Sequence, residues 1–298
     1  MILLFGGNGQ LGRELTALAA ARGVPLRALS RAEADIAKPQ AVAEAVAAAR
    51  PSLVVNAAAY TAVDKAESEP AEAARANVTG PAVLSEACAR AGLPLVHVST
   101  DYVFDGTKAG AYVERDPVAP LGVYGRTKVD GEAAVRAWLD RHLILRTSWV
   151  YGVHGRNILK TVLKLAQERE ELRYVADQRG CPTSTADFAE AILLAAPRLV
   201  VDDVNAPFGT YHFAGTGSAT WYDFVCHVIA VQAEFTRRRP RVVPIATSEY
   251  PTAARRPANS ALDSSRFAAD FGFRARPWQA RVEEAVRALL RNPAEAAA

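Results

Sequence analysis

The first twelve residues, MILLFGGNGQLG (residues 1–12), decide the fold. Ile2–Phe5 is a short apolar run without alternation, which is typical of a strand buried on both faces of a sheet. Gly6, Gly9 and Gly12 follow at intervals of three, and an amphipathic segment comes after them. In such a turn the first glycine permits a tight bend, the second lets the backbone approach a pyrophosphate, and the third lets the helix pack closely on the strand. The helix N-terminus adds N–H donors for the anion. The stretch predicts a dinucleotide-binding turn, and the alternative is a glycine-rich turn without a ligand.

The alternation of apolar runs and Ala-rich amphipathic segments continues through the N-terminal half. Further strands are expected at Leu26–Leu29, Leu53–Asn56, Leu95–Ser99 and His142–Ser148. Helices are expected at Gly12–Arg22, Pro39–Ala49, Ala71–Ala91 and Lys128–Leu139, the third of them disturbed near Asn77 and Gly80-Pro81. Repeated strand–helix–strand units predict an α/β fold with a Rossmann-type, doubly wound parallel sheet.

The regular alternation of strands and helices ends after Trp149, where shorter and more isolated elements begin. Helices are expected at Asn157–Glu168, Ala186–Ala196, Trp221–Phe235 and Trp278–Arg291, and strands at Leu172–Val175, Gly209–Ala214 and Arg241–Ile245. We therefore expect a dinucleotide-binding domain over residues 1–150, to which residues 172–200 return. Residues 151–171 and 201–298 would form a smaller α+β substrate-binding lobe. Trp221 is expected to begin a core-facing helix rather than a base-stacking platform.

Composition excludes several classes of protein. The 298 residues are 50% hydrophobic and 22% charged, with a formal net charge of +3, so the chain is not disordered throughout. It has no basic stripe with interleaved aromatics for nucleic acid, and no apolar stretch of the ~18 residues that a membrane span needs. Cys88, Cys181 and Cys226 lie far apart without CxxC spacing, and the five histidines show no metal-ligand spacing. We expect a cytoplasmic protein without a bound metal. The small net charge is compatible with a phosphate-bearing small molecule as ligand.

The end of the second expected strand indicates which dinucleotide is bound. An acidic residue there would accept the adenosine ribose hydroxyls and repel a 2′-phosphate. The chain instead has Ser30, a hydrogen-bond donor, and Arg31, which can pair with a phosphate. This favours NADPH over NADH, although a solvated Arg31 is nearly as good a reading. Asp35 and Ile36 follow closely and are expected to line the adenine pocket.

Tyr124 and Lys128 form a Tyr-x-x-x-Lys pair, which places both side chains on one face of a helix. An unperturbed phenol titrates near pH ~10, and a neighbouring ammonium lowers that pKa. Thr100 ends an expected strand, and ligands of open parallel sheets bind at that edge. We therefore expect Tyr124 to exchange a proton with an alkoxide while the Thr100 hydroxyl polarises a carbonyl.

These motifs together resemble a known family. Gly6-x-x-Gly9-x-x-Gly12, Asn56–Ala59, Ser99–Phe104 and Tyr124-x-x-x-Lys128 are similar to the extended short-chain dehydrogenases/reductases. The strings Tyr60–Glu67, Arg146–Tyr151 and Arg255-Arg256-Pro257 resemble, more narrowly, the dTDP-4-dehydrorhamnose reductase family. The resemblance runs from Met1 to about Trp278.

The resemblance implies an NAD(P)H-dependent oxidoreductase that reduces the C4 keto group of dTDP-4-dehydro-L-rhamnose to dTDP-L-rhamnose, a precursor of cell-surface polysaccharide. By position, Tyr124 would be the proton donor, Lys128 would hold the nicotinamide ribose, and Thr100 would bind the developing alkoxide. The cofactor contacts would be Gly6, Gly9, Gln10, Leu11, Gly12, Ser30, Arg31, Asp35, Ile36, Ala58, Ala59, Tyr60, Thr61, Tyr124 and Lys128. The substrate contacts would be Thr100, Asp101, Trp149 and Arg256.

Two of these substrate assignments also have alternative explanations that involve no ligand. Trp149 at a domain junction is commonly a packing residue. Arg256 suits a diphosphate because guanidinium forks match phosphate oxygens, but the Arg255-Arg256 pair could equally be an exposed loop. The resemblance also allows a homodimer and a magnesium ion at an intersubunit site, although no carboxylate cluster visible near Glu14 supports that ion.

Other functions remain open. A nucleotide-sugar epimerase would hold NAD tightly, and a dehydratase generally needs an acidic pair after Thr100, whereas Tyr102 follows Asp101 here. A non-catalytic NADP-binding regulatory subunit is a third reading. The presence of Thr100, Tyr124 and Lys128 argues against a purely regulatory role.

Overall fold

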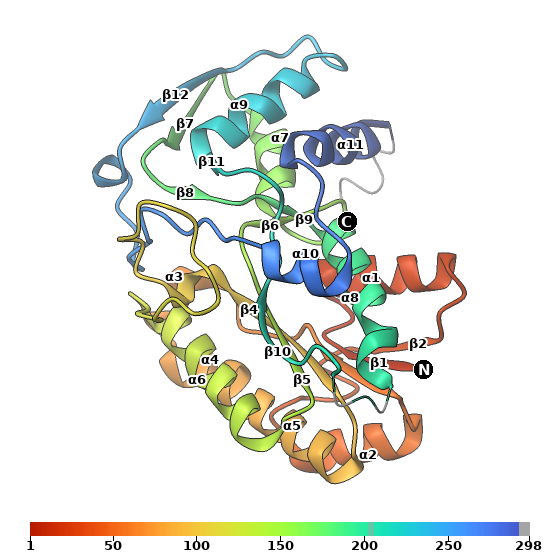
Figure 1. The fold of residues 1–298 in the computed structure, drawn as a ribbon. Helices are drawn as coiled ribbons and strands as arrows, with labels where there is room; N and C mark the ends of the chain where they lie inside the picture. Colours follow the sequence, from red (N-terminus) through yellow and green to blue (C-terminus); the bar gives the residue numbers. More distant parts are fainter. Residues whose placement is uncertain (202, 204, 292–298) are drawn as a thin grey trace.

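Six parallel strands form the central sheet of the computed structural model, which describes residues 1–201, 203 and 205–291 (Figure 1). Their bounds are β1 (Ile2–Phe5), β2 (Leu26–Leu29), β3 (Leu53–Asn56), β4 (Leu95–Thr100), β5 (His142–Thr147) and β10 (Gly209–His212). The order across the sheet is β10-β5-β4-β3-β1-β2. Phe5 pairs with both Leu29 and Asn56, so three strands end at one level. The chain order reverses between β1 and β3, which is where ligands of doubly wound sheets bind.

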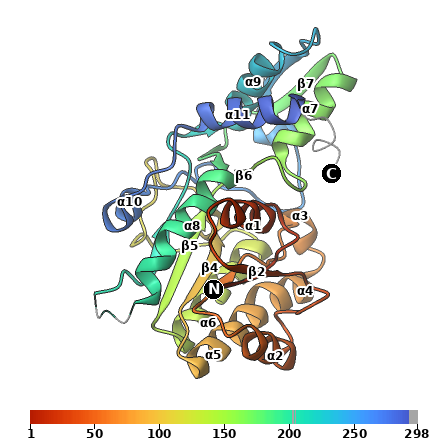
Figure 2. The ribbon, with the colours of Figure 1, turned by 90° about the vertical axis from the view of Figure 1, so that its right-hand side faces the viewer.

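Helices cover both faces of this sheet, which confirms the predicted doubly wound α/β fold (Figure 2). The covering helices are α1 (Gln10–Ala21), α2 (Pro39–Ala49), α5 (Gly80–Ala91), α6 (Val123–Trp138) and α8 (Thr185–Val200). α1 and α8 pack on one face through Leu15, Phe188 and Ile192. α2, α5 and α6 pack on the other through Val42, Leu84 and Val135. Burial of β1 and β3 on both faces explains why their runs are apolar without alternation, whereas the edge strand β2 is only partly buried.

The helix expected over Ala71–Ala91 is interrupted. It consists of α4 (Pro70–Ala74), a π-helical turn η1 (Arg75–Thr79) and then α5. Pro81 has no N–H with which to bond the carbonyl four residues earlier, at Asn77, so the α-helical ladder breaks there. α6 also begins earlier than expected, at Val123 rather than Lys128, which places Tyr124 in its first turn.

The second half of the chain builds a lobe with its own core. Its elements are β6 (Val150–Tyr151), α7 (Ile158–Glu168), β7 (Glu171–Val175), β8 (Arg179–Gly180), β9 (Thr183–Ser184), β11 (Ala219–Thr220), α9 (Trp221–Gln232), β12 (Arg241–Ile245), η3 (Thr247–Glu249) and α11 (Trp278–Arg291). Leu159, Phe224 and Val282 join α7, α9 and α11 in one apolar cluster. The short strands pair as β12-β7, β11-β8 and β6-β9.

Two strands belong to a different domain from the one expected. The strand expected at Leu172–Val175 pairs with β12 in the lobe, so only α8 from residues 172–200 returns to the central sheet. The strand expected at Gly209–Ala214 was assigned to the lobe, yet β10 pairs with β5 at the edge of that sheet. α10 (Ser265–Phe271) packs beside it through Phe267. Strand pairing between distant segments leaves no local signal in the sequence.

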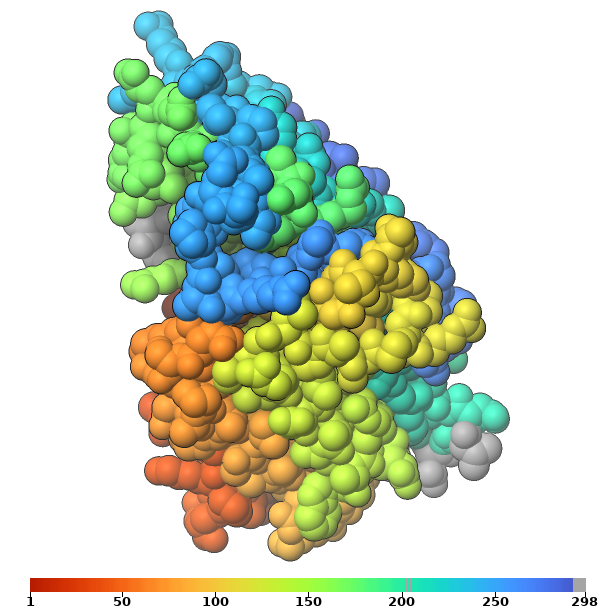
Figure 3. All heavy atoms as spheres, turned by 90° about the vertical axis from the view of Figure 1, so that its left-hand side faces the viewer, coloured from red at the N-terminus to blue at the C-terminus, as the bar shows by residue number. Residues whose placement is uncertain are grey.

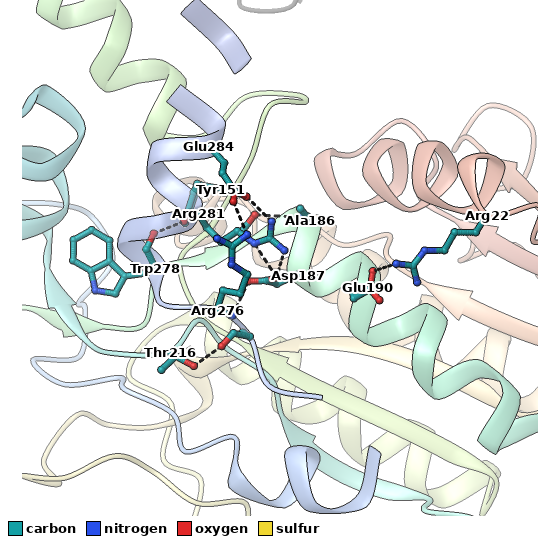
Figure 4. A network of polar contacts seen from close by, with 12 residues as sticks. Arg22, Tyr151, Ala186, Asp187, Glu190, Thr216, Arg276, Trp278, Arg281 and Glu284 are labelled. Atoms are coloured by element: carbon teal, nitrogen blue, oxygen red, sulfur yellow. Dashed lines mark hydrogen bonds and ion pairs between the residues drawn. The ribbon is translucent and has the colours of Figure 1, made fainter. Parts of the chain in front are cut away.

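Polar contacts tie the lobe to the sheet domain. Asp187 on α8 is 1% exposed and accepts hydrogen bonds from the Arg281 side chain on α11, with Nε at 2.9 Å, and from the Arg276 N–H at 3.1 Å (Figure 4). On another face, the blue C-terminal surface lies directly against the orange surface of the N-terminal half (Figure 3). There Arg256 pairs with Asp64 on α3 (Val63–Ala66) at 2.7 Å.

Candidate active site

A cleft of about 610 Å³ opens where the carboxyl ends of the central strands meet the lobe. Ten of the predicted residues line it: Gly9, Gln10, Leu11, Ala59, Thr61, Thr100, Asp101, Tyr124, Lys128 and Trp149. The other predicted residues lie outside its lining: Gly6, Gly12, Ser30, Arg31, Asp35, Ile36, Ala58, Tyr60 and Arg256. The cleft therefore brings together the glycine turn, the Tyr-x-x-x-Lys pair and the end of β4.

The glycine turn has the crowding that its pattern predicts. Gly6 has φ +90°, and a Cβ on it would lie 2.6 Å from the Ala58 nitrogen. A Cβ on Gly12 would lie 2.2 Å from the Gly6 carbonyl oxygen, so only glycine lets α1 pack this closely on β1. Gly9 is the N-cap of α1 and has no side chain to occupy the first-turn N–H groups. These donors face the cleft and suit a phosphate group.

The three candidate catalytic residues gather at the end of β4. The Thr100 hydroxyl is within hydrogen-bonding reach of the Tyr124 hydroxyl, and Tyr124 also contacts Tyr102 edge to face at 5.9 Å. Lys128 is 2% exposed, and its ammonium donates to the Val98 carbonyl at 2.7 Å. Since Tyr124 and Lys128 lie one turn apart on α6, both reach the cleft from the same helix face.

Burial governs the protonation of this cluster. It raises the pKa of Tyr124 to about 12, and only the Thr100 hydrogen bond opposes the rise. The expected lowering of the Tyr124 pKa by Lys128 is absent in the protein without cofactor. Burial lowers the pKa of Lys128 to about 8, so its amino group is already neutral at the pH where Tyr124 titrates. Tyr124 is consequently protonated at neutral pH, as a proton donor must be.

Asp101 is buried beneath the same cluster at 3% exposure. Its carboxylate accepts from the Thr100 hydroxyl at 3.0 Å and from the Ser148 hydroxyl at 2.8 Å. Burial raises its pKa to about 6, against the lowering effect of these donors and of Ser260. Asp101 thus fixes the position of Thr100 from behind.

The side chains expected around the adenosine already contact other protein groups. The Ser30 hydroxyl and N–H both donate to Glu33, each at 2.7 Å. Arg31 is largely exposed and lies 3.6 Å from Asp35, which also pairs with Arg75 at 3.0 Å. Ile36 is buried in the core beneath Gly80. These contacts provide no open 2′-phosphate pocket, so the geometry leaves the choice between NADPH and NADH to other observations.

Asn77 is a site-building residue that the sequence analysis did not identify as such. It is 1% exposed, and its side chain exchanges hydrogen bonds with the Tyr60 backbone, accepting at 2.8 Å and donating at 3.1 Å. The same amide donates to the Thr127 hydroxyl on α6 at 3.1 Å. It therefore fixes the predicted cofactor loop against the helix that carries Tyr124. The interruption expected near Asn77 was the available signal.

Two indoles form the wall of the cleft on the lobe side. Trp149 and Trp221 stack with ring centroids 3.5 Å apart and an interplanar angle of 4°. Trp149 has a positive φ of +47°, and Gly180 leaves room for its ring, since a Cβ there would lie 2.4 Å from the indole. Trp221 begins the helix α9, which packs into the lobe core through Phe224 as expected, while the Trp221 ring itself is partly exposed and lines the cleft.

A second groove of about 610 Å³ adjoins the cleft across Trp221 and Ile158. Its mixed lining includes the aromatic rings of Tyr174 and Tyr250, the cation of Arg256, and the carboxylates of Glu171 and Glu249. Arg256 lies here rather than in the catalytic cleft, and its guanidinium donates to both oxygens of Asp64, at 3.0 and 2.7 Å. Arg256 is thus placed beside a groove, but with its charge already balanced.

The described residues contain neither a metal-ligand cluster nor a helix able to cross a membrane. Within residues 1–201, 203 and 205–291, no group of three or more His, Cys, Asp or Glu side chains could hold a metal ion. Across the same residues, no helix has both the length and the apolarity to cross a bilayer.

The chain is similar to known proteins over nearly its whole length. Residues 1–291 match the family model of the RmlD substrate binding domain. The chain is 45% identical to a dTDP-4-dehydrorhamnose reductase of Sinorhizobium fredii, over 96% of each sequence. Its fold is similar to the crystal structure of a dTDP-4-dehydrorhamnose reductase of Clostridium acetobutylicum, with TM-score 0.90, 35% identity, and coverage of 97% of this chain and 99% of that one. It also resembles a Bacillus anthracis dTDP-4-dehydrorhamnose reductase in complex with NADP, with TM-score 0.89, 32% identity, and coverage of 96% and 98%.

Proposed function

The chain belongs to the RmlD substrate binding domain family, and we propose that it is an NADPH-dependent reductase of dTDP-4-dehydro-L-rhamnose in which Tyr124 donates the proton. The product is dTDP-L-rhamnose. The observation that carries the proposal is the meeting of Thr100, Tyr124 and Lys128 with the glycine turn in one cleft.

The residues present fit the dinucleotide. Gly9 leaves the first N–H groups of α1 open to a pyrophosphate, and the crowded Gly6 and Gly12 hold the turn in place. Lys128 would hold the nicotinamide ribose. When bound, NADPH supplies the hydride that reduces the carbonyl carbon. The NADP complex of the Bacillus anthracis relative favours NADPH over NADH.

The protein's own groups manage the charge that develops on the C4 oxygen. Tyr124 is protonated because burial raises its pKa to about 12, so its hydroxyl hydrogen is available to that oxygen. Thr100 stands beside it, and its single hydroxyl proton, now donated to Asp101, would turn to the same oxygen and stabilise it before proton transfer. Trp149, held by the Trp221 stack, supplies the wall against which the sugar packs.

The nucleoside diphosphate of the substrate is proposed to extend from the cleft into the adjoining groove. Tyr250 and Tyr174 offer ring surfaces for a base, and Arg256 offers a guanidinium for phosphate oxygens. Arg256 would have to exchange or share its present partner Asp64 for that contact.

Replacement of Tyr124 tests the proton donor. Tyr124→Phe should bind NADPH normally but reduce turnover of dTDP-4-dehydro-L-rhamnose by at least about 10²-fold, since general acid catalysis contributes roughly 10²–10⁴. Turnover is followed as NADPH oxidation, and binding as quenching of tryptophan fluorescence.

The matched control is Tyr222→Phe, a tyrosine of α9 outside the cleft lining, which should keep its activity. Near-normal turnover by Tyr124→Phe would refute the role of Tyr124. Purified protein that carries bound NAD and causes no net oxidation would instead support an epimerase.

The assembly and compartment are also proposals. Cys88, Cys181 and Cys226 are all free thiols, which suits a reducing cytoplasm. Leu194 and Val200 on α8 are exposed apolar side chains that a second copy would cover, so a homodimer is proposed. Light scattering of the purified chain measures the assembly directly.

A further inference from the structure

Neither of the two arginines expected to meet phosphate groups lines the cleft. Arg31 lies beside Asp35 and outside the cleft lining, while Arg256 forms a two-bond pair with Asp64. A cleft that holds a dinucleotide still needs positive charge near the pyrophosphate. A third arginine, Arg156, lies in that cleft and was not singled out by its sequence pattern.

The loop that carries Arg156 lies against the glycine turn. It connects β6 to α7, and its Gly155 is so close to the turn that a Cβ there would lie 3.2 Å from the Gln10 Cβ. The Gln10 side chain also donates to the Val150 carbonyl at 3.3 Å. The lobe therefore places Arg156 next to the N-terminus of α1.

The charges that line the cleft single out this arginine. Within the described part of the chain, the charged lining residues are Asp101, Lys128 and Arg156. Asp101 and Lys128 are buried and hydrogen-bonded to protein groups. Arg156 is exposed, and it makes no hydrogen bond or ion pair with any residue that the structure describes. Its guanidinium is available to a ligand.

We propose that Arg156 binds the pyrophosphate of the dinucleotide from the lobe side of the cleft, opposite the N–H groups of the glycine turn. A helix N-terminus supplies only about half a positive charge, which leaves a pyrophosphate dianion largely uncompensated. A guanidinium fork matches two phosphate oxygens at once. The inference rests on the proposed function, because it requires a dinucleotide in this cleft.

The contact would also join two parts of the molecule. The glycine turn belongs to the sheet domain, whereas Arg156 precedes α7 of the lobe. Cofactor binding would therefore fix the loop at residues 152–156 across the turn. Part of the binding would be electrostatic and exposed, so added salt should weaken it.

The test compares Arg156→Gln with wild type in binding NADPH and, separately, dTDP. Loss of a charge-assisted pair should raise the Kd for NADPH about tenfold and leave the Kd for dTDP unchanged. The salt dependence of NADPH binding should decrease, and Arg156→Lys should recover part of the affinity because it restores the charge. The control is Arg90→Gln. Arg90 is an exposed arginine near the end of α5, which leads into the amino end of β4, so it lies at the edge of the sheet opposite the cleft.

The outcomes separate the inference from the proposed function. An unchanged Kd for NADPH in Arg156→Gln, with wild type binding tightly, would overturn the inference and leave the function intact. A raised Kd for dTDP with normal NADPH binding would also overturn it, by assigning Arg156 to the substrate. Failure of wild type itself to bind NADPH would overturn the proposed function and the inference with it. Thermal unfolding of each variant reports whether it is folded.

Discussion

At the scale of single residues, the cleft combines a protonated phenol with an ammonium that is unusually easy to deprotonate. Burial moves both groups away from their ordinary values, raising the pKa of Tyr124 to about 12 and lowering that of Lys128 to about 8. Burial disfavours the charged form of either group, which explains the opposite directions. The proposed catalytic pair thus depends on how far the cleft excludes water, as well as on the spacing of two side chains.

If Lys128 holds the cofactor as proposed, NADPH binding should depend on pH. Its ammonium is charged below about pH 8 and loses the proton as pH rises through that value. We therefore expect the Kd of wild type for NADPH to increase several-fold between about pH 7 and pH 9, as the charge at the nicotinamide ribose is lost. Fluorescence titration at several pH values measures this.

The companion variant for that measurement is Lys128→Met. It should bind NADPH more weakly than wild type at pH 7 and show no dependence on pH across the same range. A wild-type affinity that stays constant up to pH 9 would contradict the role of the Lys128 charge.

At the scale of elements, the site depends on how α6 is oriented. Glu67 accepts the Val123 N–H at 2.7 Å and so satisfies a donor in the first turn, one residue before Tyr124. Gly131 lets the π-helical turn approach, since a Cβ there would lie 2.0 Å from the Asn77 carbonyl oxygen. The same turn presents Asn77 to the cofactor loop. The break between α4 and α5 is therefore part of the site.

Asn77→Ala should weaken both the fold and the cofactor site. It removes one buried and two partly buried hydrogen bonds, so the free energy of unfolding should decrease by about 3 kcal/mol. NADPH affinity should also decrease, because the loop at Tyr60 loses its anchor. Urea unfolding and fluorescence titration measure the two effects.

Gln40→Ala is the matched control, since that amide makes one exposed hydrogen bond to Glu44 on α2. It should change the free energy of unfolding by no more than about 0.5 kcal/mol. Equal stability losses in the two variants would mean that Asn77 has no special structural role.

At the scale of the whole molecule, the cleft exists because the lobe is held over the sheet at separate places. Asp187 and Arg281 join α8 to α11, and Asp64 and Arg256 join α3 to the segment after η3. The first pair is the more deeply buried, with Asp187 only 1% exposed. A buried carboxylate that loses its partner is costly, so this contact matters more than surface ion pairs.

Arg281→Met should lower the free energy of unfolding by about 3–5 kcal/mol, because it leaves the Asp187 carboxylate buried without its cation. Denaturant unfolding followed by tryptophan fluorescence measures the loss. The double variant Asp187→Asn with Arg281→Met should recover part of it, since the uncompensated charge is then absent.

Arg287→Met on the same helix is the control, because its pair with Glu234 is exposed and should contribute at most about 1 kcal/mol. A loss below that value for Arg281→Met would show that the buried pair does not hold the lobe in place.

The sequence by itself determined the strand–glycine turn–helix, the strands Ile2–Phe5, Leu26–Leu29 and Leu53–Asn56, and the pairing of Tyr124 with Lys128 on one helix face. These features follow from periodicity and spacing within a few residues, which a linear pattern records. The nature of the family could be inferred for the same reason, since its motifs are short and local.

Only the tertiary structure decided which distant groups meet. The pairing of β10 with β5, the stack of Trp149 on Trp221, and the pair of Arg256 with Asp64 each join segments more than 60 residues apart. Such contacts depend on how elements pack, and the residues involved are equally compatible with exposed or core positions when read alone. The fold thereby kept the two arginines expected for phosphate out of the cleft lining and placed Arg156, an unremarked loop residue, in it.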